Sequence, residues 1–279
     1  MKNDELVDCQ WLSEHLLDDN LVVLDAFMLK VVGKEPIEYP SFSTISGSRP
    51  FDIENDFCDN ESTQLHALPT QTAFTEKVQK LGVNKHSTIV IFDNQGIYSA
   101  PRAWWTFKVM GFDNVKVLDG GLPEWIAQGY PTSSTYDETS IKGDFVACYN
   151  PVKVTDYQVL LDRLNDTSQL VIDARGSARF NAEVAEPRPG VRAGRIPHSV
   201  NLPFSSLMEG HRFKSKQAIE QLFISVGALD SRCLVFSCGS GITACILILA
   251  AHHIGLSETI LYDGSWAEWG ANEKLPLAD

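Results

Sequence analysis

The chain has 279 residues and a hydrophobic fraction of 44%, enough for one large domain or two of ordinary size with buried cores. Its formal net charge is −13. An acidic protein repels polyanions, so we expect no nucleic-acid partner. No run of about 18 apolar residues is present, and residues 1–5 lack the basic start and apolar stretch of a secretory signal. We therefore expect no membrane partner and a cytoplasmic protein.

The cysteine pattern favours reduced thiols. Six cysteines are scattered without a Cys-x-x-Cys pair, and no Cys/His cluster has zinc-ligand spacing. A chain with a full apolar core and no secretion signal has little need of disulfides. We expect no metal site and at least one thiol available for chemistry. The six are Cys9, Cys58, Cys148, Cys233, Cys238 and Cys245.

The first half of the chain alternates helix-like and strand-like segments. Apolar runs rich in β-branched and aromatic residues predict strands, and amphipathic stretches predict helices. In chain order we predict a helix over 8–17, strands over 21–25 and 88–92, a helix from about 100 to 111, and a strand over 115–118.

The second half has the same order of segments. We predict a helix over 156–164, strands over 170–173 and 233–236, a helix over 243–254, and a strand over 259–262. Strands that alternate with helices favour parallel sheets with helices on both faces, the α/β class.

A single offset relates the two halves. A shift of 144 residues places Phe92 on Phe236 and Gly111 on Gly255, and the turns that follow also match. We therefore predict an internal repeat and two α/β domains, over about 1–137 and 146–279, joined by a polar, turn-rich segment.

The two halves of the repeat carry different residues at the position of Cys238. The same shift aligns Cys238 with Asn94. If this loop performs thiol chemistry, only the second domain can do so.

Cys238 stands in a glycine-rich loop, Cys238–Thr243, between a predicted strand and a predicted helix. Helix N-termini present unpaired N–H groups, and glycines let the backbone curl around an anion, so a thiolate here is stabilised and nucleophilic. The alternative is an inert cysteine in a core turn. A phosphatase would need arginine six residues after Cys238, where Ala244 stands.

Several segments together resemble the rhodanese superfamily, and in particular the 3-mercaptopyruvate sulfurtransferases. The resemblance covers nearly the whole chain. It rests on the two α/β halves and on the segments Cys238–Thr243, Asp263–Trp269, Ser99–Trp105, Arg179–Phe180 and Glu186–Gly190.

The resemblance implies two tandem rhodanese-like domains, 1–137 being catalytically inactive and 146–279 catalytic. It implies a sulfurtransferase that moves sulfur from 3-mercaptopyruvate through a Cys238 persulfide to cyanide or a thiol such as thioredoxin, with release of pyruvate and no cofactor. Catalytic residues would be Cys238 and Ser240. The active loop would also contain Gly239, Gly241, Ile242 and Thr243.

The loop carries no charged side chain, whereas thiosulfate-using relatives have basic residues there. This difference favours a donor whose charge is bound elsewhere. By resemblance, Arg179 and Arg188 hold the carboxylate and keto oxygen of mercaptopyruvate, a task that suits the planar guanidinium. The alternative is that both are surface arginines that neutralise Glu183 and Glu186.

Other interpretations stay open. Ser240 is either a proton relay or a hydrogen-bond donor within the loop. His66 matches a family histidine proposed for such a relay, but a loop histidine also serves structure alone. Thiosulfate is the alternative sulfur donor, and a non-catalytic binding or redox-sensing module is the alternative to an enzyme.

Overall fold

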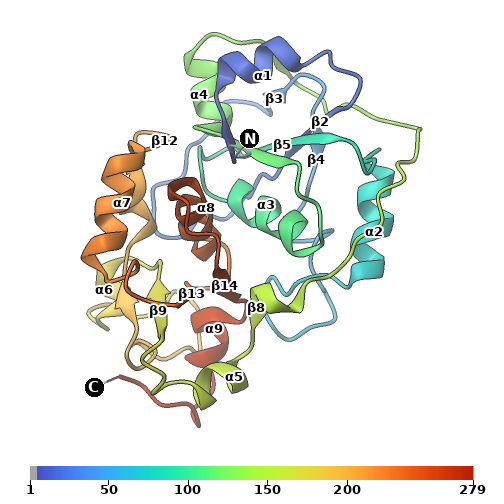
Figure 1. The fold of residues 1–279 in the computed structure, drawn as a ribbon. Coiled ribbons are helices and arrows are strands. Elements are labelled where there is room, and N and C mark those ends of the chain that lie inside the picture. The colour runs from blue at the N-terminus through green and yellow to red at the C-terminus, as the bar shows by residue number, and fades with distance from the viewer. Residues whose placement is uncertain (1–4, 279) are drawn as a thin grey trace. The chain divides into compact units, whose positions relative to one another are not determined.

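A computed structural model describes residues 5–278 (Figure 1). These residues form two compact units. The first unit comprises residues 5–59, 68–150 and 209–213, and the second comprises residues 60–67, 151–208 and 214–278. Each unit thus contains a short segment from the other half of the sequence. The predicted domain limits, 1–137 and 146–279, do not include this exchange of segments and stay a prediction.

The first unit is built on a parallel sheet of five strands. Residues in the three longer strands are almost all buried, as expected for a sheet covered on both faces. The spatial order is β1 (Leu6–Val7), β6 (Val115–Leu118), β5 (Thr88–Phe92), β2 (Leu21–Asp25) and β4 (Arg49–Pro50). A separate antiparallel pair joins β3 (Thr44–Ile45) to β7 (Thr132–Ser133).

Helices cover the faces of this sheet (Figure 1). Helices α1 (Cys9–His15) and α4 (Gly121–Ala127) bury their apolar residues in one cluster with the strands. Helix α3 (Ala100–Val109) packs on β5 and β6, and α2 (Gln71–Lys80) meets it through the edge-to-face rings of Phe74 and Phe107.

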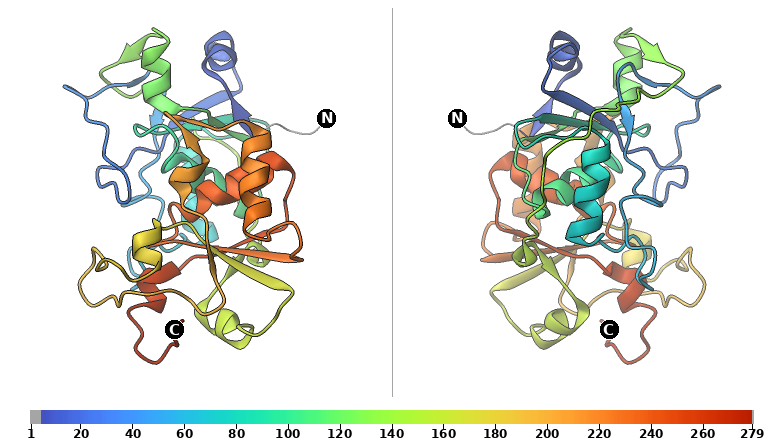
Figure 2. Two further views of the ribbon diagram at one scale, coloured as in Figure 1. Left: turned by 90° about the vertical axis from the view of Figure 1, so that its left-hand side faces the viewer. Right: turned by 90° about the vertical axis from the view of Figure 1, so that its right-hand side faces the viewer.

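The second unit repeats this plan (Figure 2). Its parallel sheet has the order β10 (Val200–Asn201), β9 (Gln169–Asp173), β13 (Cys233–Ser237), β14 (Thr259–Tyr262) and β8 (Val154–Thr155). Two 3₁₀ turns of this unit are η1 (Pro151–Lys153) and η2 (Phe204–Leu207). The short strands β11 (Met208–Glu209) and β12 (Arg212–Phe213) pair with each other, and apart from Met208 they lie in the segment 209–213, which belongs to the first unit.

Helices again lie on both faces of this sheet (Figure 2). Helices α7 (Lys216–Ser225) and α8 (Ala244–Ile254) pack together on one face. On the other face, α5 (Tyr157–Asp162) and α9 (Ser265–Trp269) bury a cluster around Trp266 and Trp269. The short α6 (Ser177–Phe180) follows β9.

The predicted repeat and the α/β class are confirmed, since each strand of one sheet has a counterpart at the same place in the other. Strands β2, β5, β6 and β14 have the predicted limits. The helices are shorter than predicted by one to three residues. Asp8 and Asp156, the first residues of two predicted helices, act as N-caps; Asp8 accepts the N–H of Trp11.

The alignment of Cys238 with Asn94 is wrong by one residue. The N–H of Trp266 donates to the Cys238 carbonyl, and the N–H of Leu122 donates to the carbonyl of Asp93, each at 2.9 Å. Asp93 is therefore the counterpart of Cys238. The loop of the first unit contains one extra residue before its helix, which a constant offset of 144 does not allow.

No helix within residues 5–278 is both long enough and apolar enough to cross a membrane.

Candidate active site

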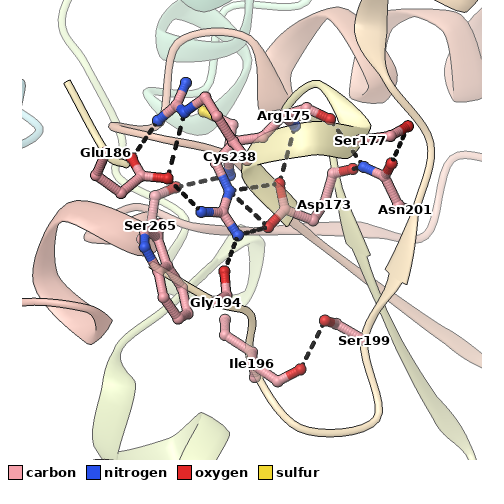
Figure 3. Close-up of polar contacts among 12 residues, drawn as sticks. Asp173, Arg175, Ser177, Glu186, Gly194, Ile196, Ser199, Asn201, Cys238 and Ser265 are labelled. Carbon is pink, nitrogen blue, oxygen red and sulfur yellow. Dashed lines mark hydrogen bonds and ion pairs between the residues drawn. The ribbon is translucent and has the colours of Figure 1, made fainter. Parts of the chain in front are cut away.

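Cys238 lies immediately after β13, at the carboxyl edge of the second sheet. Its side chain is buried, with 1% of the residue exposed. Its N–H donates to Ser265 Oγ at 3.1 Å (Figure 3). Its carbonyl accepts the N–H of Trp266. The backbone on both sides of the thiol is therefore fixed by α9, and the direction of the side chain is set by the fold.

The loop after Cys238 presents unpaired backbone donors. The N–H groups of Gly239, Ser240, Ile242 and Thr243 donate to no oxygen among residues 5–278. Gly241 has a φ of 78°, a left-handed conformation that glycine adopts without strain, and it turns the chain into α8. Helix α8 is apolar and buried through Ala251, so the loop rests on a rigid support.

The first unit demonstrates what this loop architecture binds. The carboxylate of Asp93, the counterpart of Cys238, accepts four backbone N–H groups at 2.8–2.9 Å. These donors are the N–H groups of Gln95, Tyr98 and Ser99 in the loop and of Ala100, the first residue of α3. A loop that precedes a helix in this fold thus surrounds an anion with N–H donors.

Two arginines approach the loop next to Cys238. A Cβ placed on Gly239 would lie 3.1 Å from Arg179 Nη2 and 3.7 Å from Arg188 Nη1. Both guanidinium groups therefore lie beside the residue that follows the thiol. The sequence selected both arginines, and the structure brings them together with the loop.

Arg179 belongs to an ion network around Arg175 that the sequence did not reveal. Figure 3 shows the centre of this network, with Arg175 between Asp173 and Glu186. Arg175 is fully buried and donates to Asp173, to Glu186 at 2.8 Å and to the carbonyl of Gly194. Glu186 also accepts Nε and Nη2 of Arg179, the latter at 2.5 Å.

The sequence left open that Arg179 and Arg188 only neutralise Glu183 and Glu186. The ion pair between Arg179 and Glu186 agrees with one part of that alternative. However, Glu186 is shared with Arg175, and Arg179 Nη1 has no hydrogen bond within residues 5–278. With Asp173 and Arg188 included, the group carries three positive and two negative charges. These five residues together carry one net positive charge in a chain of net charge −13.

The position of Arg175 in the sequence already indicates that it lies near the site. It stands two residues after the Asp173 that ends a buried strand, at the carboxyl edge where sites of α/β sheets gather. Its guanidinium also stacks on Trp266, 4.5 Å from the ring centroid. Sequence spacing alone did not reveal that Glu186 lies next to it.

His66 also lies against the loop. Its Nδ1 is 3.3 Å from the carbonyl oxygen of Ser240, so the ring must donate to this acceptor. Nearby, Gln64 Nε2 donates to Asp263 Oδ2 at 2.8 Å. A cleft of about 440 Å³ adjoins this segment and is lined by Thr63, Gln64, Leu65, Arg188, Pro189, Val191, Ala267, Glu268, Ala271 and Asn272.

The other cysteines lie in different surroundings. Burial raises the pKa of Cys9 to about 12 and also raises the pKa of Cys58 and Cys233, which disfavours their thiolates. Cys245 is buried in α8 and donates its S–H to the carbonyl of Gly241. Cys148 is exposed. Within residues 5–278 no group of three or more His, Cys, Asp or Glu side chains could hold a metal ion.

Comparison with known proteins agrees with this geometry. The model of the rhodanese-like domain matches residues 8–128 and again residues 156–272.

The chain belongs to the rhodanese family.

Among its relatives in this family is the 3-mercaptopyruvate sulfurtransferase of Escherichia coli (strain K12), 38% identical over 99% of both chains. The Homo sapiens 3-mercaptopyruvate sulfurtransferase is 37% identical over 95% of this chain and 91% of its own. The crystal structure of SseA from Escherichia coli matches with a TM-score of 0.83 and 32% identity, over 95% of this chain and 99% of that one.

These matches confirm three expectations for this rhodanese-family protein. The resemblance to 3-mercaptopyruvate sulfurtransferases, the tandem rhodanese-like domains and the class of enzyme, a sulfurtransferase, all agree with them.

Proposed function

We propose that the protein transfers sulfur from 3-mercaptopyruvate to a thiol acceptor through a persulfide on Cys238. The observation that carries the proposal is the position of Arg179 and Arg188 beside Gly239, next to the buried thiol. Two forked cations suit a donor with a carboxylate and a neighbouring keto oxygen.

The first step is attack of the Cys238 thiolate on the sulfur of mercaptopyruvate. A sulfur–sulfur bond forms and the carbon–sulfur bond breaks. Its electron pair goes to the carbon next to the keto group, which is protonated by the proton released from the donor's thiol. The products are pyruvate and the Cys238 persulfide. The unpaired N–H groups of Ser240, Ile242 and Thr243 would stabilise the negative charge on the sulfur.

The four N–H donors around Asp93 support this role for the loop, because they hold a carboxylate at the same point of the fold. The first unit has no thiol there and would not carry sulfur. Its loop therefore serves as an internal example of anion binding without transfer.

The second step is attack of an acceptor thiol on the outer sulfur of the persulfide, which regenerates the Cys238 thiolate. Thioredoxin is the proposed acceptor, and cyanide can replace it in an assay. Ser240 takes part through its loop N–H, while His66 fixes the loop by its bond to the Ser240 carbonyl.

The test is intact-protein mass spectrometry after mixing the protein with mercaptopyruvate. The expected result is a gain of one sulfur atom that disappears in Cys238→Ser and persists in Cys245→Ser, the matched control within the same loop–helix segment. No gain in the wild-type protein, or an equal gain in Cys238→Ser, would refute the proposal and leave a non-catalytic module.

Thiosulfate is the second candidate donor, because two arginines can also bind a sulfonate. Two plant relatives in Arabidopsis thaliana are thiosulfate/3-mercaptopyruvate sulfurtransferases, 31% and 33% identical to this chain. The uncharged loop favours mercaptopyruvate, since no cation lies within it to offset a dianion. Comparison of kcat/KM for the two donors decides between them.

A further inference from the structure

The first unit has a cavity at the edge that corresponds to the active site of the second. Its volume is about 360 Å³, within the usual size of small-molecule sites. Both charged and apolar side chains line it. They are Asp25, Phe27, Met28, Leu29, Pro36, Ile37, Glu38, Tyr39, Ser41, Phe42, Ser43, Asn94 and Gln95.

Asp25 is the unusual member of this lining. It is 1% exposed, and its Oδ2 accepts hydrogen bonds from Thr44 at 2.9 Å and Tyr136 at 3.1 Å. Its Oδ1 is buried and has no hydrogen-bond partner within residues 5–278. A buried carboxylate oxygen without a donor is costly, so its presence beside a cavity needs an explanation.

Comparison with the second unit identifies the group that Asp25 lacks. The N–H of Ala26 donates to Phe92 O beside Asp25, and the N–H of Ala174 donates to Ser237 O beside Asp173, so the two aspartates are counterparts.

Asp173 is neutralised by the guanidinium of Arg175, which donates to both of its carboxylate oxygens. The residue at the position of Arg175 in the first unit is Phe27, which has no charge to offer. The first unit thus keeps the carboxylate and has lost its cation.

We propose that the cavity of the first unit binds a small organic cation, an amidinium or guanidinium on a short apolar body, with Asp25 as its counterion. The cationic group would take the place that Arg175 fills in the second unit. Phe27, Ile37 and Phe42 supply apolar surface for the body of the ligand. Glu38 adds a second negative charge, and the acidic chain as a whole attracts cations.

The surrounding titratable groups define the pH dependence. The pKa of Asp25 is raised to about 7, chiefly by burial. Hydrogen bonds from Thr44, Tyr136 and the Phe27 backbone partly offset the effect of burial, and the charge of Asp93 adds to it. The tyrosines stay neutral there, because burial raises the pKa of Tyr39 and of Tyr136.

Lys34 donates to Gln95 O near the cavity, and burial lowers its pKa. Protons and the cation compete for Asp25, so affinity should fall as the pH decreases below about 7.

The experiment is a titration of the full chain with benzamidine, followed by nuclear magnetic resonance, with neutral benzamide as the isosteric control. We expect saturable binding of benzamidine, at least about tenfold weaker binding of benzamide, and the same loss for benzamidine with Asp25→Asn. Asp113→Asn, which removes an exposed carboxylate of the same unit, should bind like the wild type.

A second variant tests the comparison between the two units. Phe27→Arg supplies the missing guanidinium from the chain itself and should abolish benzamidine binding. If that variant fails to fold, the benzamide and Asp25→Asn titrations still decide. The proposal is overturned if wild-type protein does not bind benzamidine, or if Asp25→Asn binds it equally well. Sulfur transfer should be unchanged in Asp25→Asn, so failure here does not bear on the proposed function.

Discussion

Substitution of Asp25 by asparagine should change how stability depends on pH. In the folded protein the pKa of Asp25 is raised to about 7 from 3.8, chiefly by burial. Between these values the folded state holds a proton that the unfolded state releases. Stability therefore falls as the pH rises through this window and is lowest, as far as Asp25 contributes, above about pH 7.

The size of the effect follows from the shift. The rise of the Asp25 pKa from 3.8 to about 7 lowers the free energy of unfolding by about 4 kcal/mol at pH 8, compared with low pH. At pH 5 the same rise lowers it by only about 1.5 kcal/mol. Asparagine does not ionise, and its oxygen can still accept from Thr44 and Tyr136. Asp25→Asn should therefore gain about 2–3 kcal/mol relative to the wild type between pH 5 and pH 8.

Hydrogen exchange of the amides in β5, which pairs with β2, would report the opening free energy of the first unit at both pH values. The amides of β13 serve as the control, since the second unit should respond equally in both proteins. An equal difference between wild type and Asp25→Asn at both pH values would refute the reasoning, because Asp25 would then ionise as an ordinary carboxyl.

Three further predictions concern the second unit. Arg175→Met should destabilise this unit by about 3–5 kcal/mol, because Asp173 and Glu186 would lose a buried cation. Urea unfolding measures the change, and an unchanged midpoint would show that Arg175 does not stabilise these carboxylates. Arg188→Lys should raise KM for mercaptopyruvate about tenfold with little change in kcat, since lysine lacks the fork, whereas a change in kcat alone would refute carboxylate binding. Gly239→Ala should lower kcat/KM about tenfold without loss of thermal stability, because its Cβ would lie 3.1 Å from Arg179 Nη2 and displace that guanidinium. Activity equal to the wild type would show that the position of Arg179 beside Gly239 does not matter for donor binding.

Local pattern was enough to predict the strands and to place the Cys238 loop between a strand and a helix. The runs at Thr88–Phe92 and Thr259–Tyr262 are short, β-branched or aromatic, and bounded by polar turns, so a buried parallel strand is their natural conformation. Cys238 could be selected because a thiol, two glycines and an apolar helix follow one another in the sequence. The repeat strengthened both predictions, since two copies of one pattern must fold alike.

The sequence did not predict the correct counterpart of Cys238. A constant offset selects Asn94, but hydrogen bonds from the following helix select Asp93, because the loop of the first unit is one residue longer. An inserted residue in a loop leaves the flanking elements in place, and only the backbone contacts reveal where it is accommodated.

The sequence by itself determined which elements form, that they form twice, and which cysteine we propose as the nucleophile, since all three depend on residues close together in the chain. Only the tertiary structure decided which charges meet. Asp173, Arg175 and Glu186 form one buried network because β9 and the loop after α6 bring them together at the sheet edge. The same packing leaves Asp25 without a cation in the first unit, since a charge buried without its partner is a property of three-dimensional neighbours and leaves no local pattern.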